Sequence, residues 1–305
     1  MLGNRAPVDR APALIRWRSQ LRARSLNRHG LVSSWVATPH GRVRTLSRGR
    51  PHPHQATWVF LHGFADEATG WAPLLDPLGP RLGRVVAIDL PGHGRSDVPA
   101  CGLTPDSLLG GLFAAVGRIL AADEPLVLVG NSMGGAAAIR VAQHLAPQVR
   151  ALVLLSPAGA PMTGAEIEAV VALFTLDSAA KALALADTLM PGRLLLRQLA
   201  AQVLRRHMNR PVVAGLMRSF GDFTWLTAAE VAALPPALLV WGQHDQILPT
   251  TGEQFFRRHL SAERARCEAP PDWGHTPQLD RPRALARLIV DWARGHRGLL
   301  PGAGR

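Results

Sequence analysis

Five short apolar runs recur along the chain, and each is followed directly by a glycine or a polar residue. They occupy positions 58–61, 85–88, 126–129, 152–155 and 237–241. Because these runs are apolar at every position, they need cover on both faces, which is the situation of a strand inside a parallel sheet. Helical segments are expected between them at 104–120 and 133–145, the first with Thr104 as N-cap before Pro105, and at 283–292 near the end. This alternation predicts an α/β fold with a doubly wound, mostly parallel sheet.

The spacing of the runs also predicts how the chain is divided. Two more strands are expected at 35–38 and 42–46, around the turn Pro39-His40-Gly41, and one at 265–269. The interval 157–236 is much longer than a crossover connection requires, and it is rich in alanine, leucine and methionine. We therefore expect a core formed by 31–156 and 237–297, with 157–236 inserted as a helical cap. Residues 1–30 precede the core as a basic extension.

The positive charge is concentrated at the N-terminus. The formal net charge is +12, but residues 1–50 hold eleven arginines and a single acid, Asp9, so the rest of the chain is nearly balanced. This distribution argues against a nucleic-acid-binding core. Leu14, Trp17 and Leu21 have helical spacing among arginines, so residues 10–28 are expected either to contact an anionic membrane weakly or to form a solvated arm.

Localisation follows from what the chain does not contain. No apolar stretch is long enough for a membrane span, and no apolar segment follows the polar N-terminus as in a secretory signal. The two cysteines, Cys101 and Cys267, do not form a disulfide framework. We expect a cytoplasmic protein, with peripheral membrane contact as the alternative that the basic extension offers.

The segment Gly130-Asn131-Ser132-Met133-Gly134 has the form G-x-S-x-G and stands between an apolar strand and an alanine-rich helix. In this context the serine occupies a tight strand-to-helix turn, where only small neighbours fit and the hydroxyl points away from the sheet. The N-terminus of the following helix adds positive potential beside it. The pattern predicts that Ser132 is a catalytic nucleophile.

A serine nucleophile needs a general base, and position selects His275 among the twelve histidines. His275 follows the last expected strand and precedes the final helix, at the sheet edge from which Ser132 emerges. His259 and His296 are expected in a helix and in the tail. Asp245 follows the strand that ends at 241 and is the expected partner that orients the imidazole.

Two backbone amides are expected to bind the oxyanion that forms during attack by the serine. Met133 follows the nucleophile and supplies one of them. The other is expected from the loop after the run at 58–61, where Phe64 is favoured over Ala65. His93, in the loop 89–96, is expected to support the site without taking part in the reaction. No cysteine and histidine spacing fits a metal site and no glycine pattern fits a nucleotide, so no cofactor is expected.

The blocks around these residues resemble the α/β-hydrolase fold superfamily. They are His62-Gly63, 89–96, 130–135, 241–245 and Gly274-His275, and they occur in the order of that family across about 33–295. The resemblance implies hydrolysis through an acyl-enzyme without a cofactor, and it implies that 157–236 forms a lid over the pocket.

The resemblance also narrows the range of reactions that this chain is expected to catalyse. Serine at position 132 differs from haloalkane dehalogenases and epoxide hydrolases, which have aspartate there. The run 130–135, together with 156–159, is similar both to monoacylglycerol-lipase-like esterases and to the meta-cleavage-product hydrolases that cut carbon–carbon bonds. The latter usually carry a glycine-rich run after His-Gly, whereas this chain has Phe64-Ala65-Asp66-Glu67. We therefore expect a carboxylic ester hydrolase acting on a small-molecule ester.

Three alternatives stay open at this point. They are carbon–carbon bond hydrolysis, acyl transfer with the same residues, and a non-catalytic binding protein with a hydrolase fold. The acyl group is expected to be apolar or aryl, because large apolar side chains of the cap are candidates for lining the pocket. These are Met162, Phe174, Met190, Met208, Met217, Phe220, Phe223 and Trp225.

Overall fold

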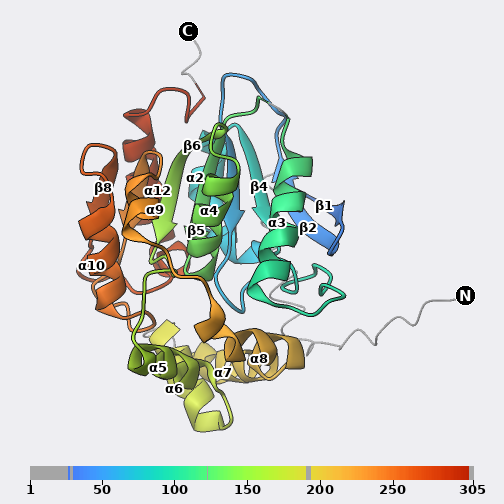
Figure 1. The fold of residues 1–305 in the computed structure, drawn as a ribbon, viewed down its shortest axis with the longest axis vertical. Coiled ribbons are helices and arrows are strands. Elements are labelled where there is room, and N and C mark those ends of the chain that lie inside the picture. Colours follow the sequence, from blue (N-terminus) through green and yellow to red (C-terminus); the bar gives the residue numbers. More distant parts are fainter. Residues whose placement is uncertain (1–26, 28–29, 122, 190–193, 302–305) are drawn as a thin grey trace, which may run out of the picture.

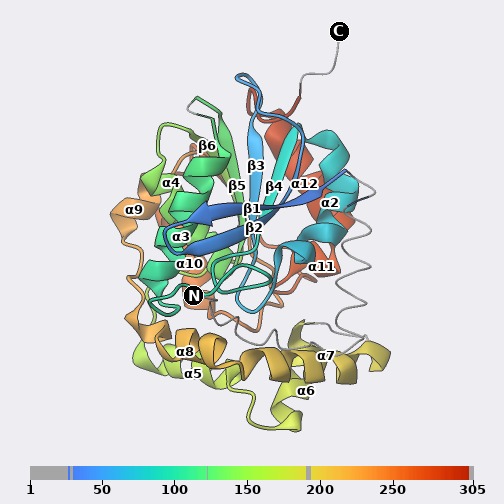
Figure 2. The ribbon, with the colours of Figure 1, turned by 90° about the vertical axis from the view of Figure 1, so that its right-hand side faces the viewer.

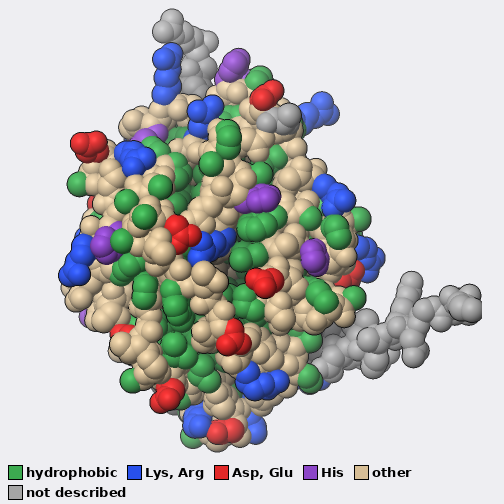
Figure 3. Space-filling view, in the orientation of Figure 1, with side chains coloured by type: hydrophobic (Ala, Val, Ile, Leu, Met, Phe, Trp, Pro, Cys, Tyr) green, Lys and Arg blue, Asp and Glu red, His purple; other side chains and the backbone are tan. Residues whose placement is uncertain are grey.

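The structure, a computed structural model, describes residue 27 and residues 30–121, 123–189 and 194–301. Almost all of the basic extension 1–30 lies outside these residues, and so does the amphipathic segment expected around Leu14, Trp17 and Leu21. On the face drawn in Figure 3, acidic and basic side chains of the described residues are interspersed, which agrees with the nearly balanced charge of the body of the chain.

Eight strands form a single sheet in the order β1-β2-β4-β3-β5-β6-β7-β8. The strands are β1 (Val32–Thr38), β2 (Gly41–Arg48), β3 (Thr57–Leu61), β4 (Arg84–Ile88), β5 (Leu126–Asn131), β6 (Val149–Leu155), β7 (Ala237–Val240) and β8 (Ala265–Glu268). β2 is antiparallel to both of its neighbours, whereas every pairing from β4 to β8 is parallel. The expectation of a mostly parallel sheet within an α/β fold is confirmed, and the antiparallel hairpin forms one edge.

Helices cover both faces of the sheet (Figures 1 and 2). One layer holds α3 (Pro105–Ile119), α4 (Met133–His144) and α10 (Thr250–His259), and the other holds α2 (Ala72–Leu78), α11 (Pro277–Asp280) and α12 (Pro282–Arg294). Alternate residues of each central strand enter the two resulting cores. In β3, Val59 and Leu61 join the core under α4, and Trp58 and Phe60 join the core under α2 and α12. This two-sided burial explains why the runs are apolar at every position.

The interval between β6 and β7 is helical. It contains α5 (Gly164–Phe174), α6 (Ala179–Leu189), α7 (Leu194–Met208), α8 (Pro211–Arg218), the 3₁₀ turn η3 (Phe220–Asp222) and α9 (Ala228–Ala232). Figures 1 and 2 show α5 to α8 as a layer across one end of the sheet, whereas α9 lies beside the core near α10. Below, "the cap" denotes α5 to α8 with η3.

Among the helices of the described residues, no single one is both long and apolar enough to cross a membrane. α5 and α6 together meet the requirements of length and composition, but they are bent by 105° where they join.

Candidate active site

Ser132 occupies a strained backbone position between β5 and α4. Its φ of 54° and ψ of −121° lie in a region that side chains with a Cβ atom rarely adopt. The turn closes because its glycines have no side chain. A Cβ atom on Gly134 would lie 2.1 Å from the carbonyl oxygen of Leu61, and one on Gly130 would lie 2.2 Å from that of Gly134. The G-x-S-x-G spacing is therefore a packing requirement of the place where α4 meets β3 and β5.

Asp245 and His275 are brought together from two loops at the same edge of the sheet. Asp245 follows β7 and His275 follows β8. The Nδ1 atom of His275 lies 2.7 Å from Oδ2 of Asp245, and both side chains are almost fully buried. The other carboxylate oxygen of Asp245 accepts hydrogen bonds from the amides of Ile247 at 2.9 Å and Leu248 at 3.3 Å.

These contacts set the charge of the pair. Burial raises the pKa of Asp245, but attraction to His275 and the hydrogen bonds from His275 and the Ile247 amide outweigh it, so the net pKa lies below the usual value. The carboxylate is therefore ionised at neutral pH and holds a proton on Nδ1 of His275. That tautomer leaves Nε2 of the imidazole available as a base.

Asn131 links the nucleophile turn to the histidine loop. Its side-chain amide donates to the carbonyl oxygens of Leu155 at 3.0 Å and His275 at 2.9 Å. Its oxygen accepts from Nε2 of Gln278 at 3.0 Å. The residue beside Ser132, the expected nucleophile, thus fixes the backbone of the residue expected to be the base. Sequence reasoning missed this role, and its only signal was a polar side chain at the second position of the motif.

The expected oxyanion donors, Phe64 and Met133, both line the cavity that contains Ser132. Met133 is the first residue of α4, and amides in the first turn of a helix have no partner within the helix. The loop that carries Phe64 packs directly on the nucleophile turn, since a Cβ atom on Gly63 would lie 3.4 Å from Cβ of Ser132. Ala65, the alternative donor, has a φ of 60°.

Two other histidines, His62 and His93, are buried next to the loop that carries Phe64. His62 is in contact with the carbonyl oxygen of Gly63 through Nδ1, and its Nε2 accepts from the amide of Leu90 at 3.0 Å. His93 lies 6.0 Å, ring centre to ring centre, from Phe64. Burial, followed by repulsion from His62, lowers the pKa of His93 to about 3, so this imidazole is neutral at ordinary pH.

The loop 89–96 holds neighbouring segments of the site in place. The carboxylate of Asp89 is fully buried, and it accepts from the amides of Ala68 at 2.6 Å and Arg95 at 2.9 Å and from Arg44 at 3.2 Å. A buried carboxylate with this set of donors joins the hairpin β1–β2, the loop after β3 and the loop after β4. The role of Asp89 is therefore structural: its carboxylate holds these three segments together.

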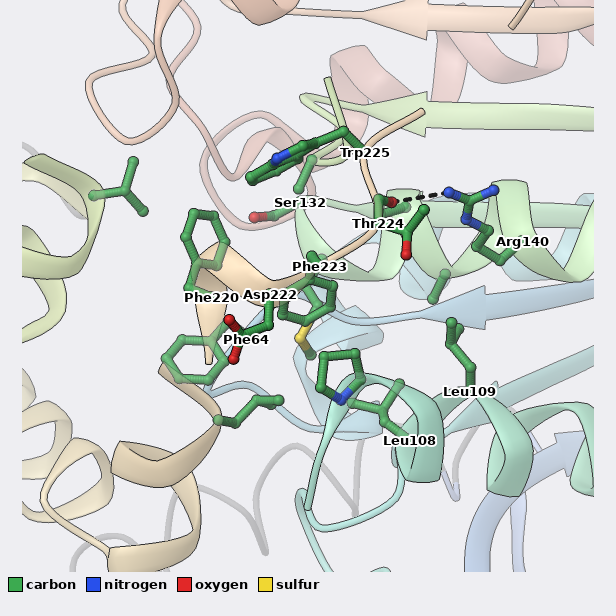
Figure 4. A pocket seen from close by; sticks show the side chains of 18 of the residues that line it. Phe64, Leu108, Leu109, Ser132, Arg140, Phe220, Asp222, Phe223, Thr224 and Trp225 are labelled. Atoms are coloured by element: carbon green, nitrogen blue, oxygen red, sulfur yellow. Dashed lines mark hydrogen bonds between the residues drawn. The ribbon is translucent and has the colours of Figure 1, made fainter. Parts of the chain in front are cut away.

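A cavity of about 1100 Å³, which includes its open mouth, lies between the core and the cap. Ser132, Phe64 and Met133 line it on the core side, and Ser132 and Phe64 are labelled in Figure 4. Of the cap side chains expected to line it, five do so: Phe174, Met217, Phe220, Phe223 and Trp225. Met208 is buried in the main core instead, Met162 packs against that core, and Met190 lies outside the described residues.

Within the described part of the chain, no group of three or more histidine, cysteine, aspartate or glutamate side chains is arranged to hold a metal ion.

Comparison with known proteins agrees with this fold. The chain is 24% identical to the monoacylglycerol lipase ABHD6 of Homo sapiens over 264 residues, which cover 80% of this chain and 77% of the relative. It is 29% identical to a 2-hydroxy-6-oxononadienedioate/2-hydroxy-6-oxononatrienedioate hydrolase of Paraburkholderia xenovorans over 269 residues, covering 77% and 86%. The crystal structure of a membrane phospholipase A, described as a bacterial virulence factor, superposes with a TM-score of 0.77 at 22% identity and covers 92% of this chain and 91% of its own.

The family is established by a match over most of the chain. Residues 58–288 match the sequence profile described as "Alpha/beta hydrolase family". This range begins within β3 and ends within α12, so it contains the cap together with Ser132, Asp245 and His275. The chain belongs to the alpha/beta hydrolase family.

Proposed function

We propose that this protein is a serine hydrolase that cleaves carboxylic esters through an acyl-enzyme on Ser132. His275 takes the proton from Oγ of Ser132, which attacks the ester carbonyl carbon. The amides of Phe64 and Met133 bind the resulting oxyanion. His275 then protonates the leaving alcohol. Water, deprotonated by His275, attacks the acyl carbon and releases the acid.

One observation carries this proposal. Asp245 and His275 form a buried pair joined at 2.7 Å, and Asn131 ties the loop that carries His275 to the turn that bears the strained Ser132. The arrangement supplies a nucleophile, a base in a defined tautomer and an ionised carboxylate that stabilises the imidazolium form. Ser132 lines a largely apolar cavity, which suits the organic part of an ester.

The charges of the cavity favour esters over carbon–carbon bond cleavage. The Paraburkholderia relative is named for a dienedioate or trienedioate, which is a dicarboxylate. Arg140 is the single cationic side chain among the described residues that line this cavity, and it is already paired with Glu230. A dianionic substrate would therefore meet no unpaired positive charge there, whereas a neutral ester needs none.

The test uses purified protein, p-nitrophenyl esters and a fluorophosphonate probe. Ser132→Ala is expected to lower kcat by at least about 10³-fold and to abolish labelling by the probe, since the nucleophile is lost. Ser261→Ala, at a serine outside the cavity, is the matched control and is expected to behave as wild type.

Wild-type turnover by Ser132→Ala would overturn the assignment. Hydrolysis of a meta-cleavage dienoate at a higher kcat/KM than any ester would replace it with carbon–carbon cleavage. Ester products formed from an added competing alcohol, in excess over the free acid, would replace it with acyl transfer.

A further inference from the structure

The cap side of the cavity is lined by aromatic rings that contact one another. The ring of Phe220 lies 5.9 Å, centre to centre, from that of Phe223 and 5.9 Å from that of Trp225. Phe64, on the core side, packs edge to face on Phe174 of α5 in the cap, with 5.6 Å between the ring centres. All five rings line the cavity that holds the proposed nucleophile. Aromatic faces carry partial negative charge and attract organic cations, most strongly in the case of tryptophan.

A carboxylate lies among these rings. Asp222 ends η3, directly between Phe220 and Phe223 in sequence, and it lines the same cavity. In Figure 4 its carboxylate is drawn between the rings of Phe220 and Phe64. No hydrogen bond or ion pair to this carboxylate is found among the described residues. Asp222 is exposed, so its charge lies in solvent at the mouth of the cavity that it lines.

The remaining charged groups of the lining do not offset this negative charge. Asp106, in the first turn of α3, is a second carboxylate. Arg140 contributes a guanidinium, but one end binds Glu230 and the other donates to the carbonyl oxygen of Thr224 at 2.9 Å (Figure 4). Its positive charge is thus compensated, so two exposed carboxylates give a net negative charge to the lining of an otherwise apolar, aromatic cavity.

We propose that this cavity selects esters whose non-reacting end carries an alkylammonium cation. The proposal rests on the ester hydrolysis proposed above and names the substrate class for the same site. An alkylammonium group is apolar on its surface and positively charged, so it suits rings that surround a carboxylate. A carboxylate at that end would be repelled by Asp222 and Asp106. Asp222 is the residue that sets this selectivity, and it takes no part in the chemical step.

The experiment compares two esters that differ only in charge. Choline butyrate and 3,3-dimethylbutyl butyrate have the same shape, because a trimethylammonium group replaces a tert-butyl group. We expect wild-type kcat/KM to be about five- to tenfold higher for the choline ester at low ionic strength, as an exposed cation–π contact with a nearby charge predicts. Added salt should reduce this ratio.

Two variants assign the effect. Asp222→Asn keeps the shape of the side chain and removes its charge, so the ratio is expected to fall to about two. Glu168→Gln removes a carboxylate from the exposed face of α5, outside the cavity, and should keep the wild-type ratio. The rate at which the fluorophosphonate labels Ser132 gives a second readout, and tetraethylammonium should slow it in wild type more than in Asp222→Asn.

The outcomes separate the two proposals. A wild-type ratio of one or less, or no protection of wild type by tetraethylammonium, would overturn the cation site while leaving ester hydrolysis intact. Equal protection by tetraethylammonium in wild type and Asp222→Asn would overturn the role of Asp222. A ratio that persists in Asp222→Asn would overturn the role of Asp222. Failure of both esters, of p-nitrophenyl esters and of probe labelling would instead overturn the proposed function.

Discussion

At the scale of single residues, Asn131 shows how the site is held together. The residue is buried, and its amide group donates hydrogen bonds to two carbonyl oxygens and accepts one from the Gln278 side chain. Asn131→Leu has a similar volume but leaves these partners unsatisfied. We expect the free energy of unfolding to fall by about 2–3 kcal/mol and kcat for a p-nitrophenyl ester to fall at least tenfold.

Urea denaturation and initial-rate kinetics measure the two effects. Gln254→Ala, which replaces an exposed amide on α10, is the control and should change neither. An Asn131→Leu protein with wild-type kcat would show that the position of the His275 loop does not depend on this side chain.

The residues of the proposed triad were within reach of sequence reasoning, but Asn131 was not. Ser132 and Asp245 each follow a strand that an apolar run predicts, and His275 follows the last expected strand, 265–269. The carboxyl ends of parallel strands meet at one edge of the sheet. The partners of Asn131 are backbone carbonyls and a glutamine that lie 24 to 147 residues away in the chain. Such contacts depend on the finished packing of loops, which periodicity does not encode.

At the scale of elements, the contact between α4 and β3 limits what position 134 can hold. Gly134 lies in the first turn of α4, where a Cβ atom would lie 2.1 Å from the Leu61 oxygen and 2.4 Å from that of His62. Gly134→Ala must therefore push the helix away from the strand. We expect a loss of about 1–3 kcal/mol in unfolding free energy and a sharply reduced kcat.

The matched control is another helical glycine. Gly117 is exposed within α3, and no atom lies within 4 Å of a Cβ built there. Gly117→Ala is expected to stabilise the protein by about 0.5–1 kcal/mol, because alanine favours the helix. Equal denaturation midpoints for the two variants would contradict the close packing of α4 on β3.

Elements were predicted most accurately where burial is strongest. Strands β3 to β8 appear within one to three residues of the expected ends, and α3 begins at the expected cap, where Thr104 accepts from the Ser107 amide. The two 3₁₀ turns and the short helix α2 between β3 and β4 were not predicted. Pro77 lies inside α2, and a proline in that position is read from sequence as a helix breaker. The individual cap helices were also beyond sequence reasoning, since their apolar faces are set by the cavity and core that they cover.

At the scale of the whole molecule, buried imidazoles make stability depend on pH. Burial lowers the pKa of His93 to about 3 and, together with repulsion from Arg210, that of His207 on α7 to about 4. An unfolded histidine binds a proton near pH 6.5, so below that value the unfolded chain takes up protons that the folded chain refuses. Stability contributed by these residues is complete above pH 6.5 and is lost as the pH falls toward 4 and 3.

Denaturation midpoints measured from pH 7.5 to pH 4.5 test this dependence. For His93 alone, we expect a loss of about 2 kcal/mol by pH 5. His93→Gln should make the decline with falling pH shallower, whereas His54→Gln, at an exposed histidine, should keep the wild-type decline. The same decline in both variants would show that His93 takes up its proton without unfolding.

The way the cap is attached has a consequence for how such a protein can change over time. The chain leaves the core after β6 and returns before the adjacent strand β7, and the amide of Leu226 donates to the carbonyl oxygen of Gly159 at 2.8 Å between the two legs. The cap is thus connected to the core at one place, between β6 and β7, whereas the candidate catalytic loops follow strands of the sheet. Recombination between the two legs could exchange one cap for another, so the preference for substrates and the chemistry of bond cleavage can evolve as separate modules.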